Sequence, residues 1–368
     1  MPPSNSQSQS ASWSASILRR DLSARAHHLA RTQNFLHEES SGSEPVVIFG
    51  RDEQGRHGNF HPVSYENICA NPAWQRRLSK PHTASRRSRA RNDWRWCELD
   101  SCNSSDALLM NIFCHPGVFN GQTLAPAVAN LLNVDPATQP HFGINPKVPL
   151  KTLRKTRAKK PGAPSPALSL SKGPDSGTWV LEVATSSSST TDDQTTINQT
   201  LTDRTEIDLQ LGNLFLEAKL TEANFQTAAP RLIERYRDLE TVFDLTRLPR
   251  KILYTPASHP PIEDYSQLEE PPETLTHPQT LPGSTRTVIN GYQLIRNVLA
   301  AYAADASFCV LSDARRHDLI ETWYSILSAI HHPTFTTRLK LLTWQELAAT
   351  LPSDLQQFLD AKYGIVPA

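Results

Sequence analysis

The stretch Thr205–Leu220, with the sequence TEIDLQLGNLFLEAKL, constrains the fold of this chain more than any other. Two runs of strand-forming residues flank Gly212-Asn213, and a Gly-Asn pair between such runs is a signal for a two-residue β-hairpin loop. If these residues form the loop, Leu211 pairs with Leu214 and the rest of the register follows. Because side chains alternate between the faces of a strand, one face of the hairpin is predicted to be apolar throughout, with Ile207, Leu209, Leu211, Leu214, Leu216 and Ala218.

The opposite face of this hairpin carries Glu206, Asp208, Gln210, Phe215, Glu217 and Lys219. The register places Asp208 directly across from Glu217, with Cβ atoms about 5 Å apart. Like charges in this relation destabilise a strand pair unless a cation lies between them, and Mg²⁺ takes carboxylate oxygens as ligands. Lys219 lies on the same face and is expected to reach the same point. The pattern favours phosphodiester hydrolysis, with a metal polarising the phosphoryl oxygen and the lysine positioning the water. A hairpin with a solvated polar face is the alternative interpretation.

Asp208, followed nine residues later by Glu217-Ala218-Lys219, resembles the D…ExK signature of the PD-(D/E)XK nuclease superfamily. The surrounding text, DRTEIDLQLGNLFLEAKLTEANFQ and ERYRDLE, resembles more narrowly a family of bacterial restriction endonucleases of that superfamily. Further similar segments are HGNFHPVSYENICANPAW, SSDALLMNIFCHPGV, YQLIRNVLAAY, FCVLSDARRHDLIETWY and LTWQELAATLP, so that the resemblance extends over most of residues 14–367. It implies an α/β fold with a restriction-endonuclease-like mixed sheet, a catalytic β-hairpin and flanking helices.

The resemblance also implies a function, that of a Mg²⁺-dependent DNA endonuclease with a restriction or defence role, and Mn²⁺ is an alternative metal. Asp208 and Glu217 would bind the metal with help from the carbonyl group of Ala218, and Lys219 would act on the attacking water. The alternative is a catalytically inactive nuclease-fold module that binds nucleic acid, against which the intact set of three residues argues. A glycosidase with paired carboxylates is a third interpretation, disfavoured by the adjacent lysine and by the few aromatic residues near the hairpin.

Acids upstream of the hairpin are candidates to complete the metal site. Ser104-Ser105-Asp106 followed by ALLMNIF predicts an N-cap and an amphipathic helix. Nucleases of this type often take an acid from the first core helix, which makes Asp106 a candidate and Glu98 a second one. The helix dipole also explains an acid in a first turn. Some of these nucleases use a glutamine that follows the lysine to hold DNA or the lysine in place. Gln226, seven residues after Lys219, is the candidate for that glutamine.

The segment from Trp74 to Trp96 is strongly basic, with eight Arg or Lys residues, one Asp and three Trp. Basic side chains neutralise phosphates and aromatic rings stack on bases. The segment therefore predicts DNA contacts, carried mainly by Arg86, Arg87, Arg89 and Arg91. A solvated basic helix face is the alternative.

Two other groups resemble metal sites only superficially. His57 and His61 are four residues apart, but the Gly-Asn between them argues against a helix that would place both on one face. Zinc sites usually show tighter pairs than the spacing of Cys97, Cys102, Cys114 and His115. The cysteines of this group are therefore predicted to be buried and structural. The chain has five cysteines, an odd number without framework spacing, which suits a reducing cytoplasm.

Composition gives no global nucleic-acid signal, because 37 basic residues balance 37 acidic ones. No apolar run reaches the roughly 18 residues of a membrane span, so the expected partner is DNA and not a membrane. A homodimer and a partner methyltransferase are both compatible with the sequence. The chain is predicted to divide into a disordered tail (1–13), an N-terminal helical and basic region with the first core helices (14–146), a low-complexity insertion (147–202) and a nuclease core (203–368) with a proline-rich acidic loop (256–286).

Hydrophobic periodicity places further elements along the chain. Helices are predicted over 14–39, 124–132, 226–243, 288–302 and 318–330. Strands are predicted over 46–49, 178–184, 252–255, 308–311 and 339–343, and Glu182 in the second of these is one more acid. Strands that alternate with helices after a hairpin predict a mixed α/β sheet covered by helices.

Overall fold

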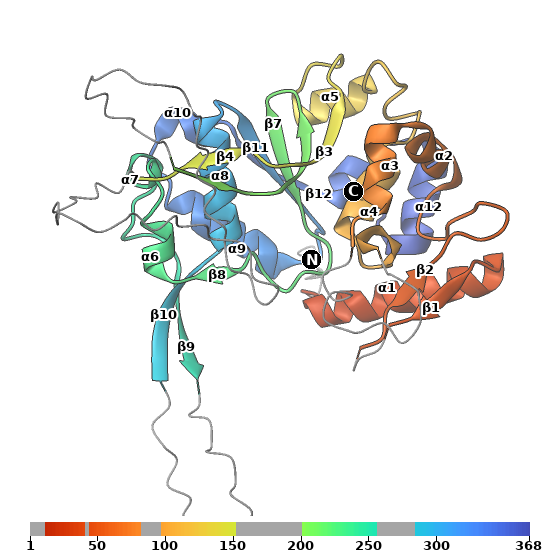
Figure 1. The fold of residues 1–368 in the computed structure, drawn as a ribbon, viewed down its shortest axis with the longest axis horizontal. Coiled ribbons are helices and arrows are strands. Elements are labelled where there is room, and N and C mark those ends of the chain that lie inside the picture. The colour runs from red at the N-terminus through yellow and green to blue at the C-terminus, as the bar shows by residue number, and fades with distance from the viewer. Residues whose placement is uncertain (1–11, 41–43, 82–96, 152–200, 256–283) are drawn as a thin grey trace, which may run out of the picture.

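The computed structural model describes residues 12–40, 44–81, 97–151, 201–255 and 284–368. Its centre is a mixed five-stranded sheet with the strand order β12-β11-β7-β6-β3 (Figure 1). The strands are β3 (Pro140–Ile144), β6 (Ile207–Leu211), β7 (Leu214–Ala218), β11 (Ser307–Ser312) and β12 (Leu339–Thr343). β7, β11 and β12 are parallel, whereas β6 is antiparallel to both β7 and β3. The predicted mixed α/β architecture is confirmed.

The hairpin β6–β7 forms in the predicted register, with Leu211 opposite Leu214 and Leu209 opposite Leu216. Gly212 adopts a positive φ of 57° in the loop, a conformation that glycine reaches without steric cost. All six residues of the predicted apolar face are at most 1% exposed. The other face of β7 is also buried, since Phe215 and Glu217 are 4% and 0% exposed. The solvated alternative is therefore wrong for β7.

Helices cover both faces of the sheet, giving three layers. Leu209, Leu216 and Cys309 belong to one core, together with residues of seven helices. These are α1 (Ala15–Gln33), α2 (Pro62–Ala70), α3 (Pro72–Leu78), α4 (Ser105–Phe113), α5 (Pro126–Leu132), α11 (Trp344–Ala348) and α12 (Ser353–Tyr363). A 3₁₀ turn, η2 (Glu98–Asp100), precedes α4. No helix in the described part of the chain is long and apolar enough to cross a membrane.

The second core lies on the opposite face of the sheet and contains Phe215, Phe308 and Val310. Its helices are α6 (Pro230–Ile233), α7 (Leu239–Val242), α8 (Tyr292–Ala303), α9 (His317–Ser328) and α10 (Pro333–Thr336). α8 connects the region after β7 to the parallel strand β11, and α9 connects β11 to β12. Such crossover helices are what parallel neighbours require.

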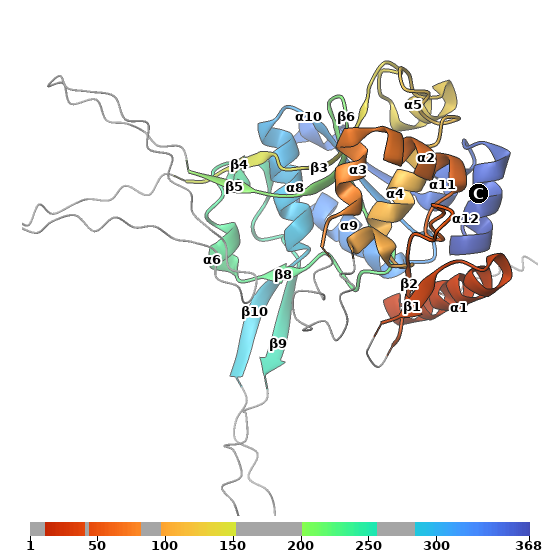
Figure 2. The same ribbon diagram turned by 45° about the vertical axis from the view of Figure 1, so that its right-hand side comes forward.

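Smaller sheets surround the central one. β1 (His37–Glu39) pairs with β2 (Val47–Phe49), and β4 (Lys147–Pro149) pairs with β5 (Thr202–Arg204). β10 (Ser284–Asn290) lies between β8 (Thr227–Ala228) and β9 (Arg250–Thr255). Figures 1 and 2 show β9 and β10 projecting from the body as a two-stranded ribbon.

Several predicted elements differ from the structure. The helix predicted over 226–243 is wrong, because Gln226 has a positive φ of 62° and β8, α6 and α7 occupy this range. Val288 and Ile289 belong to β10 instead of a helix, and Gly291, with φ of 76°, separates that strand from α8. The strand starts at Ser284, so the acidic loop does not extend to residue 286.

At the N-terminus the predicted helix over 14–39 ends at Gln33, where Asn34 adopts a left-handed conformation, and β1 follows. The predicted strand 339–343 is confirmed in full, and those at 46–49, 252–255 and 308–311 are confirmed within one or two residues. β3 was not predicted. The predicted tail (1–13) lies almost wholly outside the described residues, and Glu182 and the strand 178–184 lie outside them too.

Candidate active site

The hairpin brings together the three residues singled out in the sequence. Asp208 Oδ2 accepts a hydrogen bond of 2.8 Å from the backbone N–H of Ala218, across the strand pair. The register, continued by one residue, places Asp208 opposite Glu217. Lys219 Nζ lies 2.7 Å from Glu217 Oε1. Asp208, Glu217 and Lys219 therefore form one cluster at the end of β7.

Two amide side chains of α8 hold Glu217 from the other side. Gln293 Nε2 donates to Oε1 at 2.5 Å, and Asn297 Nδ2 donates to Oε2 at 2.8 Å. Asn297 in turn accepts a hydrogen bond of 2.6 Å from Thr205 Oγ1. A fully buried carboxylate needs such partners, because burial without them is costly.

Sequence reasoning missed both amides and pointed to Gln226, which is exposed and contributes only its backbone carbonyl to the N-terminus of α8. The available signal was the four-residue spacing of Gln293 and Asn297 in YQLIRNVLAAY. Residues four apart share one helix face, so two amides there within an apolar helix indicate a buried polar partner.

The backbone of Lys219 is fixed on both sides. Its N–H donates to the carbonyl of Leu311 at 2.8 Å, and its carbonyl accepts from Trp344 Nε1 at 2.9 Å. Arg316, which is fully buried, donates to the carbonyls of Leu220 and Glu222 at 3.2 and 2.8 Å. The chain after β7 therefore leaves the strand along a defined path, which restricts where the lysine side chain can point.

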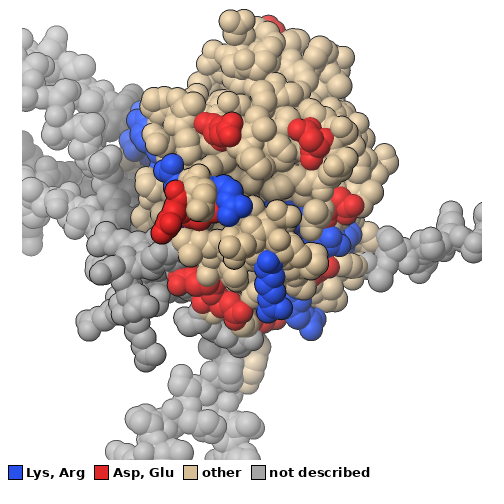
Figure 3. All heavy atoms as spheres, turned by 90° about the vertical axis from the view of Figure 1, so that its right-hand side faces the viewer, with Lys and Arg blue, Asp and Glu red and all other residues tan. Residues whose placement is uncertain are grey.

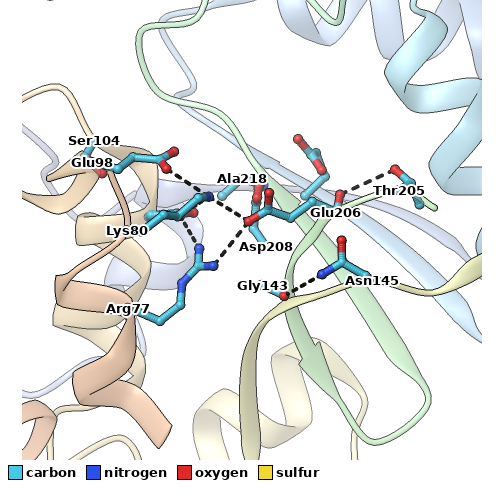
Figure 4. Close-up of polar contacts among 12 residues, drawn as sticks. Arg77, Lys80, Glu98, Ser104, Gly143, Asn145, Thr205, Glu206, Asp208 and Ala218 are labelled. Carbon is cyan, nitrogen blue, oxygen red and sulfur yellow. Dashed lines mark hydrogen bonds and ion pairs between the residues drawn. The ribbon is translucent and has the colours of Figure 1, made fainter. Parts of the chain in front are cut away.

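Further acids lie beside the hairpin, and two bases of the basic segment contact them (Figure 4). Lys80 Nζ lies 2.7 Å from Glu206 Oε1, 2.9 Å from Glu98 Oε2 and 3.6 Å from Asp106 Oδ2. Arg77 forms ion pairs with Asp106 and Glu206. Asp106, in the first turn of α4, thus lies near the hairpin, and both Asp106 and Glu98 form ion pairs with Lys80.

Acids outnumber bases in this group of side chains. It contains six carboxylates and three cations, so its formal charge is three negative: Glu98, Asp106, Glu206, Asp208, Glu217 and Glu222 against Arg77, Lys80 and Lys219. An excess of oxygen ligands with negative charge is the environment that suits a hard divalent cation.

The same crowding shifts the pKa values of the central groups. Burial, together with the charges of Glu217 and Asp106, raises the pKa of Asp208 well above its ordinary value. Burial also raises the pKa of Glu217, although the Lys219 ammonium opposes this. For Lys219, burial favours a lower pKa, but Glu217, Glu222 and Asp208 outweigh it and raise the pKa. Lys219 is therefore a cation at neutral pH.

The predicted DNA-binding arginines, Arg86 to Arg91, lie outside the described residues. Of the same basic segment, Arg77 and Lys80 turn toward the acidic group and are not a solvated basic face. On the side of the molecule drawn in Figure 3, Lys and Arg are interspersed with Asp and Glu. That side has no extended region of one charge among its described residues.

Histidines and cysteines form other contacts. His57 lies 3.2 Å from Asp100, whereas His61, His115 and Asp354 form a separate cluster. His115 Nδ1 accepts from the N–H of Gly117 at 3.1 Å, so its Nε2 carries the proton and donates to Asp354 at 3.3 Å. When one ring nitrogen of a histidine binds a metal, the other usually donates a hydrogen bond. Nδ1 of His115 accepts one instead, which favours a hydrogen-bonded His115–Asp354 pair over a metal site. All five cysteines are free thiols.

A comparison with protein families gives the relationship of the chain. A family described as Restriction Endonuclease associating with ARP matches residues 34–364, which include the central sheet, the acidic group and most of both cores. The chain belongs to this family. Membership supports a nuclease activity and fits the observed mixed α/β fold. Comparisons with curated proteins and with solved structures find no match.

Proposed function

We propose that this protein is a divalent-metal-dependent DNA endonuclease with an active site of the PD-(D/E)XK type. The observation that carries the proposal is the meeting of Asp208 and Glu217 on one hairpin, with Lys219 paired to Glu217. Family membership supports the restriction-type activity and DNA as the substrate. The enzyme would cleave DNA in the cytoplasm.

The donor set fits Mg²⁺, with Mn²⁺ as the alternative. Asp208 uses one oxygen for the N–H of Ala218 and keeps the other for a cation. Glu217 Oε2 accepts from Asn297 and has a second lone pair. Asp106 lies close enough for its charge to raise the pKa of both acids, so a cation there relieves the mutual repulsion of three carboxylates. When bound, the metal supplies Lewis-acid stabilisation of the phosphoryl charge.

Lys219 acts as a hydrogen-bond donor and a positive charge in this proposal. Its raised pKa disfavours a role as proton acceptor at neutral pH. The ion pair with Glu217 holds the buried ammonium group beside that carboxylate, where it orients the attacking water and stabilises charge that develops on phosphate oxygens. Gln293 and Asn297 keep Glu217 in place.

Association with ARP is part of the family's description, and we extend it to this chain as a proposal. A homodimer and a partner methyltransferase are two further arrangements in which such an enzyme would work.

Cleavage of supercoiled plasmid tests the proposal. Wild type is compared with Asp208→Ala and Lys219→Ala, in Mg²⁺, Mn²⁺, Ca²⁺ or EDTA. Glu321→Ala and Lys147→Ala serve as controls, since both residues are exposed and lie on α9 and β4. We expect cleavage in Mg²⁺ or Mn²⁺ that both site variants abolish and both controls retain. Full cleavage by Asp208→Ala would exclude the site, and retardation of plasmid without cleavage would favour the inactive binding module.

A further inference from the structure

The ribbon formed by β9 and β10 has no part in the site described above. Its strands pair antiparallel from Arg250 opposite Ile289 to Thr255 opposite Ser284. At its base, Ile289 and Asn290 also pair with β8. Beyond this base the ribbon extends away from the body of the molecule (Figures 1 and 2).

The two strands are basic and unusually exposed. They contain Arg250, Lys251 and Arg286 and no acid. Ile252 and Tyr254 are 70% and 63% exposed, the highest values among large hydrophobic side chains in the described ranges. A two-stranded ribbon with water on both faces is only marginally stable by itself, so these side chains are typical of a segment that binds a partner.

Alternation along the strands gives the ribbon two different faces. Ile252 and Tyr254 share one face with Thr287 and Thr285, their partners across the ribbon. Lys251 and Arg286 lie on the other face, opposite Val288 and Leu253. The first face also carries Arg250 at its base, so each face of the ribbon combines apolar with basic side chains.

The ribbon is joined directly to the helix that holds Glu217. β10 ends at Asn290, and Gly291 leads into α8, where Gln293 binds Glu217. The N–H groups of Gly291 and Tyr292 both donate to the carbonyl of Gln226, next to β8. A partner of the ribbon would therefore lie beside the acidic group.

We infer that the β9–β10 ribbon binds duplex DNA next to the bond that is cut, an inference that rests on the proposed function. A two-stranded β-ribbon fits the width of a DNA groove. Lys251 and Arg286 would neutralise phosphates, while Ile252 and Tyr254 would contact sugars and base edges. The linking residues 256–283 contain five acids and no Lys or Arg, so the basic side chains of this region belong to the strands. The strands carry basic residues without acids, whereas the side of the molecule in Figure 3 carries both charges.

Fluorescence anisotropy of a labelled duplex, measured in Ca²⁺ over a range of salt concentrations, tests the inference. The variant is the double substitution Lys251→Ala with Arg286→Ala, and the control is Lys147→Ala with Arg231→Ala, which removes two exposed charges from β4 and α6. We expect the ribbon variant to bind at least about tenfold more weakly, with a salt dependence lower by about 0.9 for each phosphate that the variant no longer neutralises. The control should bind as wild type does.

A second pair of variants tests the face that carries Ile252 and Tyr254. Tyr254→Ala should weaken binding without changing the salt dependence, whereas Tyr324→Ala, at another exposed tyrosine, should have no effect. Substitution of Lys251 and Arg286 by Gln provides a second charge-neutral variant, and unchanged unfolding temperatures show that each variant is folded.

The outcomes separate this inference from the proposed nuclease activity. Ribbon variants that bind duplex as tightly as the controls would overturn the inference, while plasmid cleavage by wild type would leave the nuclease intact. A wild type that binds duplex through the ribbon but cleaves nothing supports the DNA contact of the ribbon and contradicts the nuclease. If wild type does not bind duplex at all, the inference is wrong, and the ribbon's exposed face is then assigned to a protein contact.

Discussion

At Glu217, three donors surround a carboxylate that is fully buried, and hydrogen bonds to a carboxylate favour its charged form. Lys219 is only two residues away, whereas Gln293 and Asn297 come from α8, far along the chain. The lysine could be predicted from sequence because strand alternation alone places it on the face of Glu217. The amides could not, because their position depends on how α8 packs against the sheet.

Substitution of Asn297 by Ala tests this environment. Loss of one donor should raise the pKa of Glu217 further, so the acidic limb of the activity–pH profile should move to higher pH. The unpaired acceptor should also cost about 2 kcal/mol in the free energy of unfolding. The control is Thr205→Val, which removes the hydroxyl that donates to Asn297 but leaves Glu217 its donors. An unchanged pH profile for Asn297→Ala would show that the amide does not act on Glu217.

Asp208 provides a test of charge crowding through stability. The pKa of Asp208 is raised in the folded state, so ionisation of this side chain destabilises the folded protein once the pH exceeds the ordinary pKa of an aspartate. At lower pH the side chain is protonated, and this destabilisation is absent. Asp208→Asn keeps an acceptor for the N–H of Ala218 and removes the charge. In EDTA at pH 7 this variant should be more stable than wild type, because it has no charge to bury at this position.

Urea unfolding at pH 7 and pH 3.5, with and without Mg²⁺, measures this difference. The gain should be smaller at pH 3.5, where wild-type Asp208 is protonated, and Mg²⁺ at pH 7 should stabilise wild type more than Asp208→Asn. Equal stabilisation of both proteins by Mg²⁺ would contradict a cation bound at Asp208.

Among the elements, the hairpin was the most predictable, because a two-residue loop and strict alternation fix its register locally. The region after it was not, since Pro230 and the left-handed backbone at Gln226 break a hydrophobic pattern that otherwise indicates a helix. β10 was missed for a related reason. Its buried end, Val288 and Ile289, continues the apolar spacing of α8, and only Gly291 marks the boundary.

Trp344 on α11 tests how a neighbouring element positions Lys219. Trp344→Phe removes the donor to the carbonyl of Lys219 and should reduce the free energy of unfolding by about 1–3 kcal/mol, the range for a buried acceptor left unpaired. It should also lower the cleavage rate. Trp323→Phe is a matched control, because Trp323 is equally buried but belongs to the other core. Equal rates for the two variants would show that the hydrogen bond has no part in positioning Lys219.

On the scale of the whole molecule, the three-layer arrangement places Asp208 and Glu217 between two cores. On one side lies α4, which carries Asp106, and on the other lies α8, whose amide side chains bind Glu217. The alternation of helices and strands predicted this layering. The composition did not reveal the acidic group, because balanced total charge hides six carboxylates gathered from two segments, 98–106 and 206–222, that are far apart in the chain.

Binding of Mn²⁺, followed by electron paramagnetic resonance of the free ion, tests most directly whether this acidic group is a metal site. Wild type is compared with Asp208→Asn and with Glu321→Gln, an exposed acid on α9. We predict that wild type and Glu321→Gln remove Mn²⁺ from solution equally, that Mg²⁺ displaces it, and that Asp208→Asn binds it at least about tenfold more weakly, a difference of about 1.4 kcal/mol. Equal Mn²⁺ binding by Asp208→Asn and wild type would contradict the proposed site.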